Sequence, residues 1–230
     1  MSVFYDHACD VLRSIYDTRI ETPPILPTDI YFPGAALFTG RWRDIRREVL
    51  AIGEQLAGAP RFHEIMGEQA AISAQDGRDW RMLLLKAYGV AMPDNLKKCP
   101  TIASLLEDAP EVISCVISML APGKHIPRHR GPFRGILRFH LMLVMPLDAD
   151  GVPAATLEID GAEHRLSEGE HLLWDDTYPH EVWNHSDAPR IALLLDVRRP
   201  DMPYDMAVLS RLVVSIVQLG MRWNGVAYGG

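Results

Sequence analysis

The sequence predicts a mainly β fold, an antiparallel sandwich or jelly roll with helical flanks. Short apolar runs of strand length follow one another from residue 112 to residue 197, with turn residues between them. Asp160-Gly161 separates two alternating segments, which is a strong hairpin signal. Amphipathic helical patterns stand before and after this region. The length of 230 residues is enough for one well-buried domain, which we expect over residues 1–230.

Several helices are expected before the strand-rich region. Residues 3–17 show rough helical spacing and lead into a proline-rich linker. Residues 41–57 are predicted to form one amphipathic helix. The apolar side of that helix consists of Ile45, Val49, Leu50, Ile52 and Leu56. Residues 80–91 are compatible with a strand, and residues 100–106 with a short helix that Thr101 can cap.

The jelly-roll core is expected over residues 111–199, between a partly helical flank at 1–110 and a helical segment at 200–230. Strands are predicted at residues 112–120, 136–145, 171–174, 180–184 and 190–197, and as a hairpin over 155–166. Residues 206–219 are predicted to form a helix that packs on the sandwich, with binding to a membrane surface as the alternative. Its apolar face contains Leu209, Leu212, Val213 and Ile216.

Composition narrows the class of partner and the compartment. Lys plus Arg is 23 and Asp plus Glu is 30, so the net charge is −7, and there is no basic run. This balance argues against nucleic acid or an anionic membrane as the main partner. No stretch reaches the ~18 uncharged apolar residues of a membrane span, and the N-terminus lacks the features of a signal peptide. Cys9, Cys99 and Cys115 show no metal-type spacing and are expected to be buried, which favours a reducing, cytoplasmic location.

The chemistry-bearing residues concentrate in the strand-rich third. It holds His125, His129, His140, His164, His171, His180 and His185. Alternation along residues 136–144 puts Arg138, His140 and Met142 on one face and the packing residues on the other. An arginine inside a sandwich needs an anionic partner. For Arg190 the pattern leaves two sources open, the protein's own Asp196 or Glu181, and an anionic ligand.

The histidines of the strand-rich third leave a metal site open as well. Imidazole is the commonest metal ligand, and His129 and His180 stand near predicted strand ends. The usual non-haem iron arrangement adds one carboxylate to two histidines, and that carboxylate commonly stands two residues after the first histidine. Here the residues are His129-Arg130-Gly131, so the carboxylate is missing. The adjacent pair Asp175-Asp176 is interpreted as a turn former rather than a site.

Two long motifs resemble a known family. HRGPFRGILRFHLMLVMP at 129–146 and LLWDDTYPHEVWNHSDAPRIALLLDVRRP at 172–200 resemble the aspartyl/asparaginyl β-hydroxylases, which are Fe(II)- and 2-oxoglutarate-dependent oxygenases on a cupin-like double-stranded β-helix. The resemblance covers about residues 115–200 and accounts for Gly131, since members of this family have Gly there. It departs at Met142, where many relatives have Gly, and this would narrow the cavity.

The resemblance implies a role for each matching residue. His129 and His180 would be the iron ligands, with no catalytic side chain beyond the metal centre. Arg190 would bind the far carboxylate of 2-oxoglutarate through its planar fork. The remaining co-substrate positions would be Arg138, His140, Ser118 and, outside the clear motifs, Trp80.

The implied activity is hydroxylation of an unactivated carbon with O2 and 2-oxoglutarate as co-substrates. The substrate would be the β-carbon of an Asp or Asn residue in a peptide or protein, or a small acid, with an acyl chain as the least expected choice. Arg128, Arg130 and Arg134 near the rim indicate an acidic group on it, unless they belong to a solvated loop. Two further readings stay open. One is a non-catalytic jelly-roll module that binds a small acid or a protein partner, and the other is a metalloenzyme that needs no 2-oxo acid. The oligomeric state is not predicted.

Overall fold

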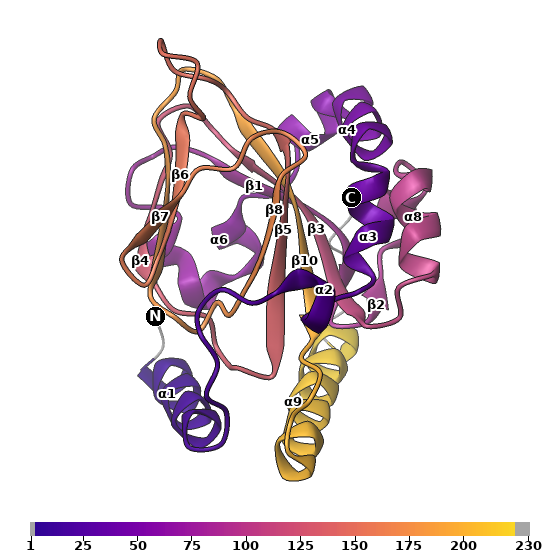
Figure 1. The fold of residues 1–230 in the computed structure, drawn as a ribbon, viewed down its shortest axis with the longest axis vertical. Coiled ribbons are helices and arrows are strands. Elements are labelled where there is room, and N and C mark those ends of the chain that lie inside the picture. The colour runs from indigo at the N-terminus through magenta and orange to yellow at the C-terminus, as the bar shows by residue number, and fades with distance from the viewer. Residues whose placement is uncertain (1–2, 224–230) are drawn as a thin grey trace.

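The computed structural model describes residues 3–223, and the side chains of residues 6–221. The helices before the main sheet are α1 (Val3–Asp17), α2 (Thr28–Tyr31), α3 (Ala35–Gly40), α4 (Trp42–Ala51), α5 (Gly53–Ala57), α6 (Phe62–Ile65) and the 3-10 helix η1 (Gly67–Ile72). Two more, α7 (Pro93–Leu96) and α8 (Pro100–Glu107), interrupt the strands, and α9 (Tyr204–Trp223) follows them. Figure 1 shows the helices arranged around a β core.

The strands form two antiparallel sheets. They are β1 (Trp80–Ala87), β2 (Val90–Ala91), β3 (Val112–Leu120), β4 (His125–His129), β5 (Ile136–Val144), β6 (Ala155–Ile159), β7 (Ala162–His164), β8 (His171–Trp174), β9 (His180–Asn184) and β10 (Arg190–Arg198). One sheet has the order β2-β1-β3-β10-β5-β8 and the other the order β4-β9-β6-β7. The predicted fold class, a mainly β jelly roll with helical flanks, is confirmed.

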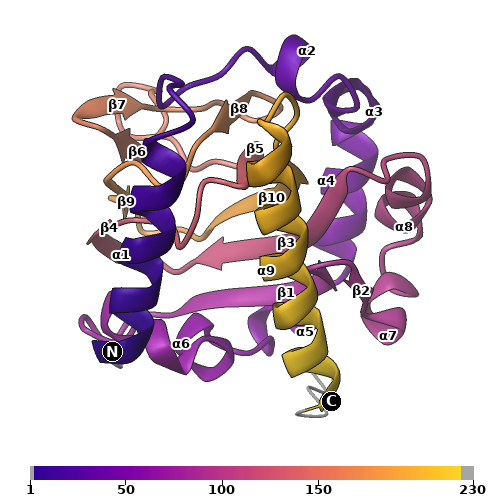
Figure 2. The same ribbon diagram turned by 90° about the horizontal axis from the view of Figure 1, so that it is seen from below.

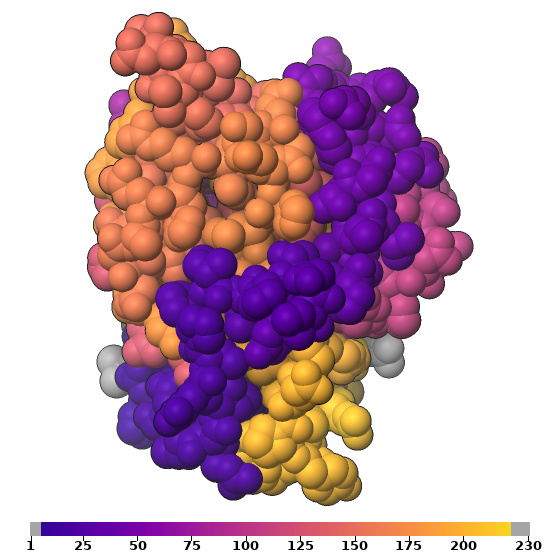
Figure 3. Space-filling view, in the orientation of Figure 1, coloured from indigo at the N-terminus to yellow at the C-terminus, as the bar shows by residue number. Residues whose placement is uncertain are grey.

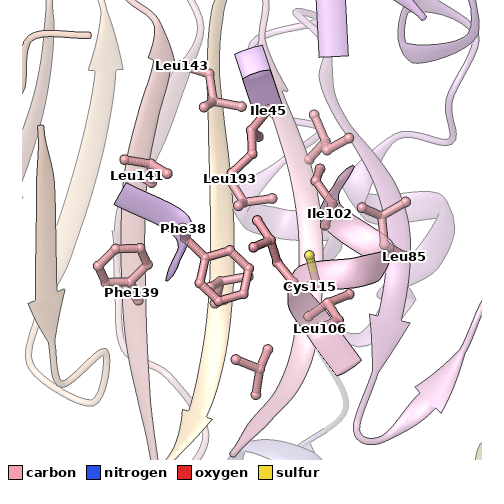
Figure 4. Packing of buried hydrophobic residues seen from close by; sticks show 14 of the residues in the cluster. Phe38, Ile45, Leu85, Ile102, Leu106, Cys115, Phe139, Leu141, Leu143 and Leu193 are labelled. Atoms are coloured by element: carbon pink, nitrogen blue, oxygen red, sulfur yellow. The ribbon is translucent and has the colours of Figure 1, made fainter. Parts of the chain in front are cut away.

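The main apolar core lies between the six-stranded sheet and the helices on its outer face. Leu141 of β5 and Leu193 of β10 pack there against Phe38 of α3, Ile45 of α4 and Ile102 of α8 (Figure 4). Burial of each such side chain contributes about 1.5–3 kcal/mol, so the helices are part of the domain rather than an appendage. The alternation predicted for residues 136–144 is confirmed, because the odd-numbered residues from Leu137 face the helices.

The predicted helix over residues 41–57 is broken into α4 and α5. The break falls at Ile52, whose φ of −102° and ψ of 26° leave the helical region. Ile45, Val49, Ile52 and Leu56 are buried as predicted. Leu50 is not, with 45% of its surface exposed, because it directly follows Val49 and points a quarter-turn away from the buried side.

The six-stranded sheet extends into the N-terminal flank. Residues 80–91 form a hairpin, β1 and β2, through Tyr88 and Gly89, which have φ of +45° and +84°. β1 then pairs with β3 along its length. β4 is not among the predicted strands, and its Pro127 is a residue that is unfavourable inside a sheet. The fold tolerates this proline because β4 is an edge strand and its register with β9 breaks between Ile126 and His129.

The N-terminal segment between α1 and α3 is tied to the sheet edge. Ile25 forms an isolated antiparallel bridge with Trp174 at the end of β8, and the Leu26 amide donates to the Leu173 carbonyl at 2.9 Å. In the space-filling view this indigo segment crosses in front of the strands (Figure 3). The long N-terminal flank therefore encloses the β core on this side.

The predicted packing face of the last helix is confirmed for Leu209 and Val213, which pack against the core, and is wrong for Leu212 and Ile216. α9 buries Met206, Ser210 and Val214, whereas Leu212 and Ile216 are 55% and 61% exposed. By length and mean hydropathy, residues Tyr204–Met221 within the described part form one helix that could cross a membrane, and 17% of this window is buried. The sequence predicts no membrane span because no stretch of ~18 apolar residues is free of charged residues.

Candidate metal and anion site

Two histidines converge between the sheets. His129 ends β4, His180 begins β9, and the two are paired in the strand register. Their ring centroids lie 4.1 Å apart with 55° between the planes. Nδ1 of His129 contacts the Pro127 carbonyl at 2.8 Å, and Nδ1 of His180 contacts the Tyr178 carbonyl at 2.9 Å. Because a carbonyl only accepts, both Nδ1 atoms carry the proton, and both Nε2 atoms keep a lone pair.

Burial keeps both rings neutral. It lowers the pKa of His129 to about 4, with the charge of Arg138 acting in the same direction. It lowers the pKa of His180 well below its usual value, and the neighbouring His129 and Arg138 add to the effect. A neutral imidazole with a free Nε2 and a fixed Nδ1–H is the form that ligates a metal ion.

The carboxyl group of Asp176 lies beside Gly131, the position at which the His129-Arg130-Gly131 motif lacks a carboxylate. The amide of Gly131 donates to the backbone carbonyl of Asp176, and a Cβ on Gly131 would overlap the Asp176 carboxyl group. Asp176 Oδ1 is buried without a hydrogen-bond partner. Burial raises the pKa of this carboxyl to about 6, against the lowering influence of Arg138. The side chain of residue 131 is thus absent, and a carboxyl group from the loop before β9 fills its place.

Residues 6–221 contain no cluster of three or more His, Cys, Asp or Glu side chains that could hold a metal ion. The donor set for a metal is therefore the two imidazoles, with the Asp176 carboxyl group in the outer surroundings. Two neutral nitrogen donors with open positions suit a divalent transition metal that must also bind small ligands. The free Nε2 pair and the orphaned Asp176 oxygen fit such an ion.

Arg190 is buried without an anion. It begins β10, is 4% exposed, and makes no ion pair with any described residue, since Asp196 pairs with Arg138 and Glu181 with His125. Its Nη2 contacts Nε2 of His140, while Arg190 Nε and His140 Nδ1 are both buried and unpartnered. Burial lowers the pKa of Arg190 to about 10, which still leaves a cation at neutral pH. The described residues thus do not supply the counter-charge, so of the two sources left open by the sequence an anionic ligand is the one that fits.

Arg138 lies close by, but its charge is already balanced. It donates to Asp196 Oδ1 at 3.0 and 2.9 Å and lies 3.3 Å from Asp176. These two carboxylates raise its pKa against the effect of burial. The structure places it between the Asp176 carboxyl group and β10, with no need of a further anion.

Ser118 and Trp80 meet on adjacent strands. The Trp80 indole Nε1–H donates to Ser118 Oγ at 3.0 Å, and the Trp80 ring stacks on Phe62 with centroids 4.0 Å apart. Ser118 is paired in register with Ala192 of β10, two residues from Arg190. The hydroxyl therefore lies in the same interior row as the guanidinium.

The three arginines that were expected near the rim have different partners. Arg128 pairs with Glu158 at 2.6 Å, and Arg130 Nε donates to the Thr177 carbonyl at 2.5 Å. Arg134 is buried and ion-paired with Asp175 at 3.0 Å, so the prediction that it can meet a substrate is wrong.

Asp176 is the described site residue that the sequence did not predict, since the Asp175-Asp176 pair was interpreted as a turn. Asp175 supports that reading only in part, because its buried carboxylate also binds Arg134 and Arg199. The available signal was the spacing: the pair stands just before His180, in a segment otherwise rich in aromatic residues.

Comparison with known proteins identifies the family. The model of the aspartyl/asparaginyl beta-hydroxylase family matches residues 39–200. The chain belongs to this family. It is 34% identical over 182 residues to the ornithine lipid ester-linked acyl 2-hydroxylase of Rhizobium tropici, covering 79% of this chain and 63% of that protein. It is 29% identical over 166 residues to the human aspartyl/asparaginyl beta-hydroxylase, covering 70% of this chain and 20% of that protein.

Both relatives are hydroxylases by name, and this chain spans less than two thirds of each. Among solved structures, a predicted oxalate decarboxylase from Thermotoga maritima overlaps 55% of this chain and 89% of its own at 12% identity, with a TM-score of 0.35. A TM-score this low does not establish a structural relationship. The fold class of this family member therefore rests on its own sheet order, and the substrate and co-substrate remain to be proposed.

Proposed function

We propose that this member of the aspartyl/asparaginyl β-hydroxylase family is an Fe(II)- and 2-oxoglutarate-dependent hydroxylase. The single observation that carries the proposal is Arg190, a buried cation with no anionic partner among the described residues that contacts His140. In addition to burial, the charge of Arg138 lowers the pKa of His140 as well as those of His129 and His180, which puts the two pairs near Arg138. Burying an unpaired cation is costly. A dicarboxylate co-substrate would remove that cost and would satisfy the orphaned nitrogens.

His129 and His180 would hold the iron through their Nε2 atoms. When bound, Fe(II) with 2-oxoglutarate and O2 supplies the oxidising chemistry, in which one oxygen atom enters a C–H bond while 2-oxoglutarate becomes succinate and CO2. Arg190 would take the far carboxylate through its two-pronged guanidinium, since that geometry matches a carboxylate. His140 Nδ1 and Ser118 Oγ would add neutral hydrogen bonds to the same acid.

The chain's other interior residues would exclude water. Met142 is almost fully buried and packs with Ala155, Ala192 and Leu194 on the inner face of the sheets. This apolar wall would favour a bound anion's contact with Arg190 over contact with solvent, because a low dielectric strengthens charge pairing. Arg138, fixed by Asp196, would hold the Asp176 carboxyl group beside Gly131.

For the substrate we propose a carbon next to an acidic or amide group, the β-carbon of an Asp or Asn residue or of a small acid. The relative from Rhizobium tropici, which acts on an ornithine lipid acyl chain by its name, adds an acyl chain as a further choice. Arg130 remains the rim cation for a substrate carboxylate. The buried cysteines, which no disulfide joins, support a reducing compartment, and we propose that the protein is cytoplasmic.

The test is an anaerobic titration with Fe(II) and 2-oxoglutarate, read by the visible charge-transfer band, followed by a succinate assay after air is admitted. We expect the band with the wild type, its loss in His180→Ala, and loss of 2-oxoglutarate binding in Arg190→Ala. Exposed Arg165→Ala is the matched control and should behave as the wild type. Absence of the band in the wild type, or its persistence in His180→Ala, contradicts the proposal. Binding of the acid without succinate in any substrate screen would identify a non-catalytic module instead.

A further inference from the structure

α9 is apolar on two opposite faces and uses one of them in the core. Its inner face packs Met206 and Val214 against Ile113, Phe133 and Ile136. Its outer face carries an apolar stripe with a spacing of three or four residues, which we name the outer stripe: Tyr204, Val208, Leu212, Ile216 and Leu219. Figure 2 shows α9 along the outside of the molecule. A soluble helix ordinarily shows a polar face to water, so the outer stripe requires a partner.

The outer stripe is bordered by positive charge. A cleft of about 440 Å³ runs beside α9 and is lined by Arg198, Arg211, Val214, Ser215 and Gln218. Neither Arg198 nor Arg211 forms an ion pair with any residue whose side chain is described. The acidic residue on this face, Asp205, is held by Arg19 at 2.7 Å. An acidic chain of net charge −7 therefore presents here an apolar row beside two guanidinium groups that form no ion pair with a described side chain.

The same side of the molecule supports the candidate site. Ser210 of α9 donates to the Gly135 carbonyl, and Arg13 of α1 donates to the Gly131 carbonyl at 2.7 Å. Both helices therefore rest on the loop that follows His129. α1 adds exposed apolar residues of its own, Val11 and Ile15. The inner face of α9, opposite the outer stripe, therefore contacts the loop that follows a candidate metal ligand.

We propose that the outer stripe docks α9 in the plane of an anionic lipid bilayer, with the stripe among the acyl chains and Arg198 and Arg211 on lipid phosphates. Apolar burial together with guanidinium contacts to anionic lipid is the combination that holds interfacial helices. A spanning orientation would remove Met206 and Val214 from the core. A symmetric second copy would bring the two Arg211 groups together across the axis, where like charges repel. The proposal does not depend on the hydroxylase activity.

The experiment is co-sedimentation of the full chain with vesicles of phosphatidylcholine alone, or of phosphatidylcholine mixed with phosphatidylglycerol. We expect binding to the mixed vesicles, weaker binding to the neutral ones, and weakening by salt. The double variant Leu212→Asp with Ile216→Asp should lose binding by about tenfold or more. The control is Leu147→Asp, an equally exposed leucine on the loop after β5, which should bind as the wild type.

A second readout reports insertion directly. Because Cys9, Cys99 and Cys115 are buried, an environment-sensitive label goes to a cysteine introduced in Leu212→Cys or, as control, Leu147→Cys. Mixed vesicles should shift the emission to the blue only for the label at position 212. Absence of wild-type binding, equal binding of the double variant, or a blue shift at both positions would overturn the proposal. A dimer in solution that the double variant abolishes would assign the outer stripe to a second copy and would overturn it as well.

Discussion

The carboxyl group of Asp176 occupies the space that a side chain at Gly131 would fill. The amide of Gly131 also donates to the Asp176 carbonyl, so the loop after β4 and the loop before β9 contact through both backbone and side chain. This relationship explains in physical terms why the residue two positions after His129 is glycine. The negative charge expected at position 131 comes instead from another loop, in contact with Arg138.

Gly131→Ala is expected to lower the free energy of unfolding by about 1–3 kcal/mol, because the new methyl group overpacks a buried site against the Asp176 carboxyl group. Urea denaturation measures the change. Gly67→Ala is the matched control, since nothing lies within 4 Å of a Cβ at that position. Adding Asp176→Gly to Gly131→Ala removes the overlap, so the two changes should be less than additive. Additive effects would contradict the contact.

Arg190→Met is expected to raise the free energy of unfolding of the ligand-free protein by about 1–3 kcal/mol, because it removes a buried charge that has no partner. The same variant should lose any thermal stabilisation by 2-oxoglutarate. Arg199→Met is the informative comparison, since Arg199 is equally buried but bound to Asp175. It should destabilise by about 3–5 kcal/mol. If both variants changed the free energy of unfolding in the same direction, the difference between an unpaired Arg190 and a paired Arg199 would be refuted.

The sequence predicted the β core well because alternation and turn residues act locally. The register of β5 puts Leu137, Phe139 and Leu141 toward the helices, and the Asp160-Gly161 turn has the positive φ values, +50° and +85°, that its hairpin requires. Each of these features follows from neighbouring residues alone.

The remaining differences between the predicted and the observed structure depend on tertiary contacts. β4 was missed because Pro127 is acceptable only on an edge strand, and the sequence does not say which strands are edges. The predicted packing face of α9 was wrong for Leu212 and Ile216 because valine and leucine occur on all sides of the helix, so periodicity does not separate the inner face from the outer stripe. Asp176 was missed because its proximity to Gly131 joins two loops far apart in the chain.

The stability of the protein should acquire a specific pH dependence from His140. Burial and the charge of Arg190 hold the pKa of His140 well below the ordinary value, which is about 6.5 in an unfolded chain. As the pH falls below about 6.5, the unfolded chain binds a proton there that the folded protein does not bind. The free energy of unfolding should therefore fall by about 1.4 kcal/mol per pH unit from this residue alone.

His140→Gln removes that contribution and leaves the other histidines in place. The difference in unfolding free energy between wild type and variant should be constant above about pH 6.5 and should change with the stated slope below it. Urea denaturation of both proteins between about pH 5 and pH 8 measures it. Parallel curves over the whole range would show that His140 titrates normally and is not buried as the structure has it.

Glu48→Ala should destabilise the helical cover of the main sheet. α8 begins at Pro100, and the residue before it, Cys99, makes no side-chain cap. Glu48 of α4 supplies the missing acceptors, since its carboxylate receives the amide of Thr101 at 2.7 Å and that of Ile102 at 3.2 Å. Thr101, which the sequence predicted as the cap, is itself capped from another helix.

Loss of these two hydrogen bonds should lower the free energy of unfolding by about 1–2 kcal/mol. A carboxylate at a helix N-terminus accepts from the free amides and interacts favourably with the positive end of the helix dipole. Glu48→Gln, which keeps acceptor capacity but not the charge, should cost less. Glu54→Ala, at an exposed position on α5, should leave stability unchanged. Hydrogen exchange provides the local readout: the amides of Thr101 and Ile102 should exchange faster in Glu48→Ala but not in Glu54→Ala. Unchanged protection of both amides would show that α8 does not depend on this contact.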